Sequence, residues 1–370
     1  MRNLLKCLLA AAFCLNPPES KGQILSDTAA IRLITDGMHN IYNIEFDKAG
    51  SAYEALSQRY PDHPVLYLFN GMKIYWENFP MLPSSSARIT FEKEMRKCIE
   101  ISDADKCPSP QYEAEYLLSN ICARGLLLLF FSDNDLSSDV IPLVTSSYRI
   151  LMRTFNYTSY LPDFYYFTGI YNYYRDAYPR VYPIYKTVAF MFPQGDLEVG
   201  LRQLEICGKT SVALRAEAYA ILSWIRMNFE TNFTKALPYS EHLVVQYPSN
   251  PLYMVYYIKN LLLLKKYDEA EKIINSSGKV GNNKFYSAAL KILSGLLQEK
   301  KYRNDNSARI LYQQGIDELS AFGAFANEYT GYGYFGLSRI NEREGNIHER
   351  RINHRKAMDL VDFKEINFND

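Results

Sequence analysis

The sequence is poor in histidine, tryptophan and cysteine, and it carries no excess of either charge. Its 370 residues contain 5 His, 2 Trp and 6 Cys, while Lys and Arg together number 41, as do Asp and Glu together. A formal net charge of zero gives no overall attraction to nucleic acid or to an anionic membrane. We therefore expect no nucleic-acid partner.

The cysteines are too scattered for a metal site. Cys7 and Cys14 lie in the first residues of the chain, and the later cysteines show no Cys-x-x-Cys or comparable ligand spacing. These later cysteines are Cys98, Cys107, Cys122 and Cys207. In an oxidising compartment Cys98 and Cys107 are near enough in sequence to form a disulfide, and isolated buried thiols explain them equally well. We expect no zinc site and leave the Cys98–Cys107 disulfide open.

Long hydrophobic runs are also missing beyond the N-terminus. Leu126–Phe131 and Leu261–Leu264 are short apolar stretches, and charged residues flank both. A membrane-spanning helix needs about 20 mostly apolar residues, so both stretches are better explained as buried helix faces. We expect no transmembrane segment in the mature chain.

The first residues have the pattern of a secretory signal peptide. A basic start at Arg2 and Lys6 precedes the apolar run Leu8–Leu15, and the small residues Ser20 and Gly22 follow. This order of a basic, an apolar and a small-residue region is what signal peptidases recognise. We expect cleavage after Gly22.

Removal of residues 1–22 implies a location across the inner membrane, either periplasmic or associated with the outer membrane. A lipoprotein is the alternative, because Cys14 follows an Ala-Ala-Phe segment. Phe13 argues against lipidation, since a small residue is usual immediately before the modified cysteine.

The prediction of the fold is based mainly on an internal repeat. Phe46–Ala49 is followed by Tyr60–Pro64, and Phe233–Ala236 is followed at the same spacing by Tyr247–Pro251. In the first copy small and aromatic residues form one helical stripe, and the Tyr-Pro pair ends the helix because proline cannot continue it. Two distant segments thus share one helical unit.

The unit resembles the tetratricopeptide repeat, in which small residues mark the crossing of two helices and a proline follows the second. Gly37, Ala49, Tyr53 and Pro61 fall at the small, small, aromatic and proline positions of that motif. Looser copies carry Ala236 and Pro248, Tyr267 and Ala270, Ala308 and Tyr312, and Leu337, Ser338, Gly345 and Ala357. The resemblance covers most of residues 27 to 360 and implies stacked helical hairpins.

The breaks between apolar stripes predict an all-α fold, a helical-hairpin solenoid (TPR-like superhelix) of about eight helix pairs. Hairpins are expected over 23–175 and 196–362, with an irregular insert at 176–195 and a tail at 363–370. The predicted pairs are 27–43 with 46–59, 64–79 with 84–101, 110–131 with 136–154, 161–175 with 196–207, 211–229 with 233–246, 250–265 with 267–276, 282–300 with 304–320, and 328–344 with 346–360.

Aromatic residues are what the chain has in excess, with 31 Tyr and 20 Phe, and they are densest around the insert. Pro179, Pro183 and Pro193 exclude one continuous helix there. The segment resembles a signature of bacterial envelope tetratricopeptide proteins, carried by Tyr171, Tyr173, Arg175, Pro179, Lys186, Phe192–Pro193, Gly195–Asp196, Gly200–Leu201 and Leu204. Most of these rings are expected in the core, and a subset is expected to line a binding groove. Our candidate binding residues are Tyr174, Arg175, Tyr178, Arg180, Tyr182 and Lys186.

Motifs for catalysis or cofactors are missing from the sequence. His348 and His354 are six residues apart, so they face different sides of a helix, and we assign them to a solvated terminal face. Acidic residues such as Asp133 and Glu198 are expected in turns or at helix starts, where carboxylates stabilise free N–H groups. No Gly-rich phosphate loop, nucleophile elbow or Cys-His pair stands out. We expect no enzyme, no cofactor and no metal.

The predicted function is recognition of other envelope proteins or peptides by a scaffold whose first helices form a concave inner face. Two alternatives stay open. Tyrosines that stack on sugar rings would make the chain a carbohydrate-binding envelope protein. Carboxylates contributed by several helices would make it an enzyme with a dispersed site that has no local motif.

Overall fold

The computed structural model describes residues 23–103, 106–181, 192–276, 280 and 282–369, and in them the chain is all-helical without strands. The predicted signal peptide at 1–22 and residues 182–191, half of the predicted insert, lie outside the described residues. The all-α prediction is confirmed for the part of the chain that the structure describes.

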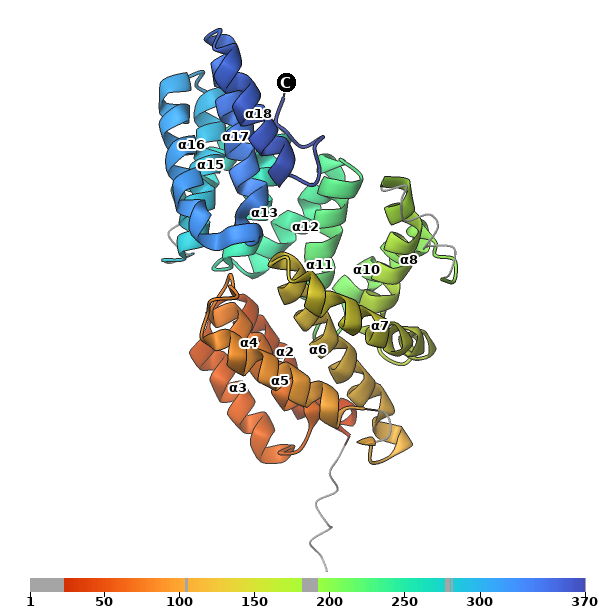
Figure 1. Ribbon diagram of the computed structural model, residues 1–370. Helices are drawn as coiled ribbons and strands as arrows, with labels where there is room; N and C mark the ends of the chain where they lie inside the picture. Colours follow the sequence, from red (N-terminus) through yellow and green to blue (C-terminus); the bar gives the residue numbers. More distant parts are fainter. Residues whose placement is uncertain (1–22, 104–105, 182–191, 277–279, 281, 370) are drawn as a thin grey trace, which may run out of the picture.

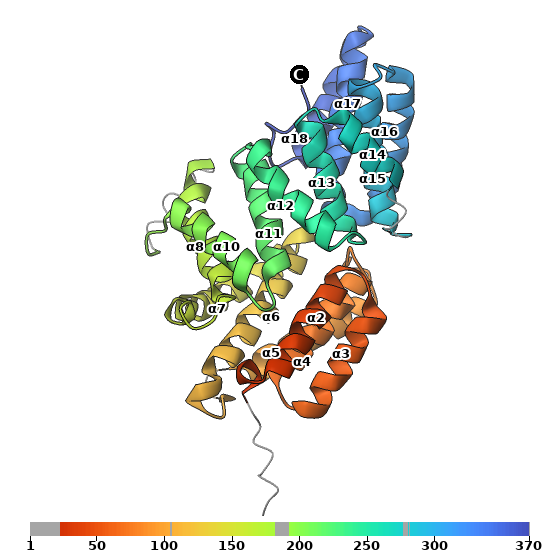
Figure 2. The same ribbon diagram turned by 180° about the vertical axis from the view of Figure 1, so that it is seen from behind.

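The helices pack in pairs that are adjacent in the chain (Figures 1 and 2). Successive pairs also touch each other in chain order. The pairs are α2 (Thr28–Tyr42) with α3 (Phe46–Arg59), α4 (Pro64–Glu77) with α5 (Ala87–Ile101), α6 (Glu113–Asp133) with α7 (Ser137–Thr154), α8 (Phe164–Val181) with α10 (Leu197–Thr210), α11 (Arg215–Trp224) with α12 (Phe233–Gln246), α13 (Pro251–Leu263) with α14 (Tyr267–Ser276), α15 (Lys284–Lys300) with α16 (Asp305–Leu319), and α17 (Asn327–Arg343) with α18 (Ile347–Leu360). First helices make further contacts in both halves of the chain: α2 with α4, α4 with α6, α11 with α13, α13 with α15, and α15 with α17.

The predicted pairs coincide with these helices apart from shifts of their ends, with one larger error. The helix expected to stop at residue 175 continues to Val181 and includes Pro179. A proline this close to a helix C-terminus removes only one backbone hydrogen bond near the end of the ladder. The irregular insert therefore begins later than residue 176.

One backbone conformation recurs in the turns within six of the described pairs. A residue with positive φ stands two positions before the start of the second helix in each of them. Where the residue after it donates five residues back, as Glu45 N–H does to the Asn40 carbonyl (2.8 Å), the turn is a Schellman motif. The residues with positive φ are Ile44, Asp135, Thr231, Lys265, Arg303 and Gly345.

The repeat seen in the sequence is also a repeat of backbone structure. Tyr60 ends α3 with φ −134° and ψ 57°, and Tyr247 ends α12 with φ −130° and ψ 63°. Both N–H groups donate to the carbonyl four residues earlier, at 2.9 and 2.8 Å. Pro64 and Pro251 then occupy the first turn of the next helix, where a missing N–H costs nothing.

Small residues lie where helices approach most closely. A Cβ atom on Gly37 would be 2.4 Å from the ring of Phe69 and 3.3 Å from the Cβ of Ala52, and Ala49 is fully buried. Between α8 and α10, a Cβ atom on Gly200 would be 2.6 Å from the backbone nitrogen of Tyr173. Larger side chains at Gly37 or Gly200 would force these helices apart.

The row of pairs curls so that its beginning meets its later part (Figure 2). The Asn250 side chain donates to the carbonyl of Tyr42 at the end of α2 (2.8 Å), and the Asn283 side chain donates to the Phe79 carbonyl after α4 (2.7 Å). Phe79 stacks on Trp76 and meets rings beyond α14, with centroids 6.3 Å from Phe285. The first two pairs therefore pack against the later part of the row.

Among the described helices, α6 with its preceding turn (Pro110–Asp133) is the one long and apolar enough to cross a membrane by length and composition. In its most apolar window 61% of the residues are buried inside the protein. Arg124 on this helix also makes internal hydrogen bonds to Asn120 and Ser146. The segment therefore serves as a core helix in this structure.

The recurrent turn predicts opposite effects of one substitution at two glycines. Gly345 has φ 77° and Gly50 lies inside α3, and an added Cβ would meet nothing within 4 Å at either position. Gly345→Ala should lower the free energy of unfolding by about 1 kcal/mol, because alanine resists positive φ. Gly50→Ala should raise it by about 0.5–1 kcal/mol through helix propensity. Urea unfolding measures both, and effects of equal sign would contradict the assignment.

Candidate functional site

Two of the predicted binding residues, Tyr174 and Tyr178, belong to an aromatic cluster at the end of α8. The Tyr174 ring lies 5.2 Å from Phe229 and 6.3 Å from Tyr178, measured between centroids. Phe363 of the C-terminal tail packs on Phe229 at 5.2 Å. Tyr178 is 39% exposed, whereas Tyr174 is half-buried. The cluster joins α8, the π-helical segment after α11 (Ile225–Phe229) and the tail.

The two predicted arginines have different surroundings. Arg175 donates to the carbonyl of Phe192 (3.0 Å) and so ties the chain after the insert to α8. Arg180 is exposed and forms an ion pair with Asp176 at 2.7 Å. Tyr182 and Lys186 lie outside the described residues. The structure thus brings Tyr174 and Tyr178 together. Arg175 instead holds the chain that follows the insert against α8.

Arg180 lines a polar pocket of about 360 Å³ between the end of α8 and the start of α10. Its lining residues are Asp176, Arg180, Gln194, Gly195, Asp196, Leu197 and Glu198. Asp196 accepts from the Val199 N–H and caps α10. Asp176 and Asp196 therefore have local partners, and Glu198 lies in the first turn of α10, as its expected position at a helix start requires.

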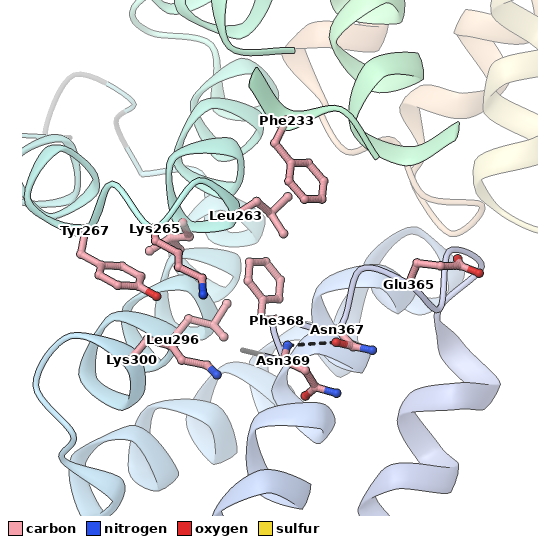
Figure 3. Close-up of a pocket in the computed structure, with 11 residues that line it drawn as sticks. Phe233, Leu263, Lys265, Tyr267, Leu296, Lys300, Glu365, Asn367, Phe368 and Asn369 are labelled. Atoms are coloured by element: carbon pink, nitrogen blue, oxygen red, sulfur yellow. Dashed lines mark hydrogen bonds between the residues drawn. The ribbon is translucent and has the colours of Figure 1, made fainter. Parts of the chain in front are cut away.

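A second, smaller pocket of about 100 Å³ lies under the C-terminal tail (Figure 3). Phe368 of the tail points toward Leu263 and Phe233, and Asn369 N–H donates to the Asn367 side chain. This volume holds a few water molecules and is below the 300 Å³ typical of ligand pockets. The tail therefore covers the hydrophobic core at this place, and the remaining space is too small for a typical ligand.

The strongest convergence of polar side chains occurs on the inner face of the array. Tyrosines and carboxylates from seven first helices interact electrostatically there. We call this set the inner cluster: Tyr42 (α2), Tyr75 (α4), Asp133 (α6), Tyr166 (α8), Glu217 (α11), Tyr253 and Tyr256 (α13), and Glu328 (α17). Tyr174 adjoins it through its interactions with Tyr166 and Tyr256.

Four members of the inner cluster are surrounded by protein atoms but keep part of their side-chain surface accessible to solvent. Asp133, Tyr166, Glu217 and Tyr256 are half-buried by accessible area, although protein surrounds each of them densely. Tyr42 and Tyr253, by contrast, are buried completely. The four half-buried side chains therefore form the solvent-accessible part of the inner cluster.

Glu217 is held by a tyrosine from the first helix of the chain. The Tyr42 hydroxyl donates to Glu217 Oε1 at 2.9 Å. Burial raises the pKa of Glu217, and the hydrogen bond from Tyr42 opposes that rise. A carboxylate has more acceptor capacity than one hydroxyl uses, so Glu217 can accept further donors.

Asp133 is the last residue of α6, and the expectation that it caps a helix start is wrong. Burial raises its pKa to about 7, and a hydrogen bond from the Tyr75 hydroxyl limits the rise. The C-terminal end of a helix is also electrostatically unfavourable for a negative charge. The sequence did not predict a buried carboxylate at this position, because an Asp near a turn normally caps the N-terminus of the following helix.

Glu328 differs from these two carboxylates because it has an internal cation. Lys259 Nζ forms an ion pair with Glu328 Oε1 at 2.5 Å and donates to Asn228 Oδ1 at 3.1 Å. The Lys259 side chain is 1% exposed and lies 5.3 Å from the centre of the Tyr332 ring. The Tyr332 hydroxyl also donates to Glu328 at 2.6 Å.

The described residues contain neither a metal cluster nor a disulfide. No group of three or more His, Cys, Asp or Glu in this part of the chain has the arrangement of a metal site. The four described cysteines are free, so the Cys98–Cys107 bridge is not formed in the structure. Burial raises the pKa of the Cys207 thiol to about 12, which leaves it unreactive as a thiolate.

Comparison with models of known protein families and with curated proteins gives no match for this chain. Its class therefore rests on the structure itself: it is an all-α protein of helix pairs packed in chain order.

The raised pKa of Asp133 predicts how stability depends on pH. The folded protein binds a proton at Asp133 that the unfolded chain releases near pH 4, so the free energy of unfolding should fall between about pH 4 and about pH 7. Asp133→Asn should remove of the order of 2 kcal/mol of this fall. Urea unfolding across this range measures the slope.

Tyr75→Phe is the matched control. Without the hydroxyl that stabilises the carboxylate, the pKa of Asp133 should rise further, and the fall in stability should extend to higher pH. An unchanged slope in both variants would show that Asp133 is ordinarily solvated.

Proposed function

We propose that the chain is a tetratricopeptide-like helical solenoid that binds an extended peptide or protein segment on its inner face. It acts as a scaffold without chemistry of its own. The signal-peptide-like pattern at the N-terminus supports a location in a bacterial envelope, either periplasmic or associated with the outer membrane. The observation that carries this proposal is the convergence of side chains from seven first helices in the inner cluster.

The composition of the inner cluster supports recognition. Half-buried tyrosines offer large contact areas at low entropic cost, and such residues are enriched at binding surfaces. Tyr174 and Tyr178 extend this aromatic surface toward the insert. Tyr174 and Tyr178 are therefore the two sequence candidates that adjoin the inner cluster.

A second candidate is the enzyme with dispersed carboxylates. Asp133, with a pKa of about 7, is poised to exchange a proton near neutrality, which is a property of general acids and bases. Turnover of any substrate that disappears in Asp133→Asn, with binding retained, would favour this candidate over a scaffold. Its other requirements, a nucleophile or an oxyanion donor set, have no counterpart among the residues of the inner cluster.

Selection from a displayed library of random peptides against the purified mature chain tests the proposal. Selected peptides should bind the wild type and lose at least about tenfold in affinity to Tyr256→Ala. Tyr178→Ala should weaken the same peptides by a smaller factor while thermal unfolding barely shifts, because this ring is 39% exposed.

Ile310→Ala is the matched control. Ile310 is 54% exposed on α16, the second helix of its pair, and its truncation should change neither affinity nor stability. Equal affinities of the wild type and Tyr256→Ala for every selected peptide would remove the inner face from the binding site.

A further inference from the structure

The C-terminal tail runs without a helix from Val361 to Asn369 and lies across the first helices of the last four pairs. Near its start, Phe363 packs on Trp224 of α11 with ring centroids 5.3 Å apart. Near its end, Phe368 packs on Tyr332 of α17 at 5.1 Å. Between these contacts the tail lines one small pocket together with the ends of α13 and α15 (Figure 3). A single extended segment therefore lies against four first helices.

The tail turns apolar side chains toward the helices and charged side chains toward solvent. Ile366 is 1% exposed, and Phe363 and Phe368 are half-buried. Lys364 and Glu365, which stand between them, are exposed. The surface thus accepts an aromatic residue, an aliphatic residue three positions later and a second aromatic residue two positions after that.

Arg339 of α17 holds the main chain of the tail. Its Nη1 donates to the Asn367 carbonyl at 2.6 Å. Its Nε and Nη2 donate to the two carboxylate oxygens of Glu299, at 2.9 and 2.8 Å. Glu299 is 2% exposed, so this bidentate pair fixes the direction of the remaining donor. A contact to a backbone carbonyl does not depend on the side chain, so another extended segment can use it equally well.

The tail does not fit this surface completely. Phe368 has φ 56°, a backbone conformation that is costly for a bulky residue. A cavity of about 100 Å³ remains beneath the tail, with Leu263 and Leu296 in its wall. Side chains around such a space lose van der Waals contacts. A segment with a relaxed backbone and a larger side chain at this place would bind more tightly than the tail does.

We propose that the tail occupies the binding site of an extended partner segment, which carries two aromatic residues five positions apart and an aliphatic residue between them. This inference rests on the proposed peptide-binding function and names the class of peptide. The partner displaces the tail, its rings replace Phe363 on Trp224 and Phe368 on Tyr332, and Arg339 donates to its main chain. Departure of the tail breaks no helix, because none of its residues is helical.

A tethered competitor makes the site selective. A segment attached by a short linker acts at an effective concentration of the order of 1 mM. A tail with an intrinsic dissociation constant of about 100 µM would then weaken every partner about tenfold. Segments that fit no better than the tail are therefore excluded, and better-fitting ones still bind.

Fluorescence anisotropy with a labelled synthetic peptide of residues 361–369 tests the proposal on the mature chain. The protein variant carries Phe363→Ala and Phe368→Ala, which remove the ring contacts of the attached tail and leave the helices unchanged. The peptide should bind this variant at least about tenfold more tightly than it binds the wild type, whose own tail holds the site. Phe363→Ala alone should give a smaller increase, so that the test does not depend on the stability of the double variant.

Substituted peptides then examine the pattern. A peptide with Phe368→Ala should bind the double variant at least about tenfold more weakly than the unsubstituted peptide does. A peptide with Lys364→Ala is the matched control, because Lys364 is exposed in the attached tail, and its affinity should not change. Equal affinities of all three peptides would overturn the pattern.

The outcomes separate this inference from the proposed function. Library-selected peptides that bind the inner face, but that the tail peptide does not displace, overturn the inference and leave the proposed function standing. Equal binding of the tail peptide to the wild type and the double variant also overturns it. If neither the selected peptides nor the tail peptide binds, both fail. A wild type that sediments as a dimer, beside a monomeric double variant, would assign the site to the tail of a second copy and overturn the partner segment.

Discussion

The docking of the first two helix pairs onto the later ones is the constraint on which the rest of this structure depends. Hydrogen bonds from Asn250 and Asn283 to the backbone carbonyls of Tyr42 and Phe79 join parts of the chain about two hundred residues apart. These carbonyls are at helix ends, where the backbone lacks partners of its own. Because of this docking, first helices from both halves of the chain face one inner surface.

The sequence predicted the helix pairs well because their determinants are local. The Tyr-Pro pairs that begin at Tyr60 and Tyr247 act within a few residues of their own positions, and the small residue Gly37 acts on Ala52 and Phe69 in the next two helices of the chain. The inner cluster had no such signal, since Tyr42 and Glu217 are 175 residues apart and no periodicity relates them.

Two carboxylates of the inner cluster lower the stability of the protein in the ionised state. Lys259 forms an ion pair with Glu328 inside the protein. A similar cation beside Asp133 or Glu217 would have paired with that carboxylate in the same way. Without such a cation, the carboxylates ionise less readily, as the raised pKa of Asp133 and Glu217 indicates. Functional surfaces commonly retain such unfavourable groups, because a ligand then gains what the free protein lacks.

The distance in sequence between docking partners has a kinetic consequence. Helix pairs form from local contacts and can fold early, but α2 cannot meet its partner until the chain has extended past Asn250. During that interval the aromatic rings near Trp76 and Phe79, which later pack against Tyr253 and Phe285, have no cover. A chaperone that binds these exposed rings would therefore help the nascent chain until its sixth and seventh helix pairs have been synthesised.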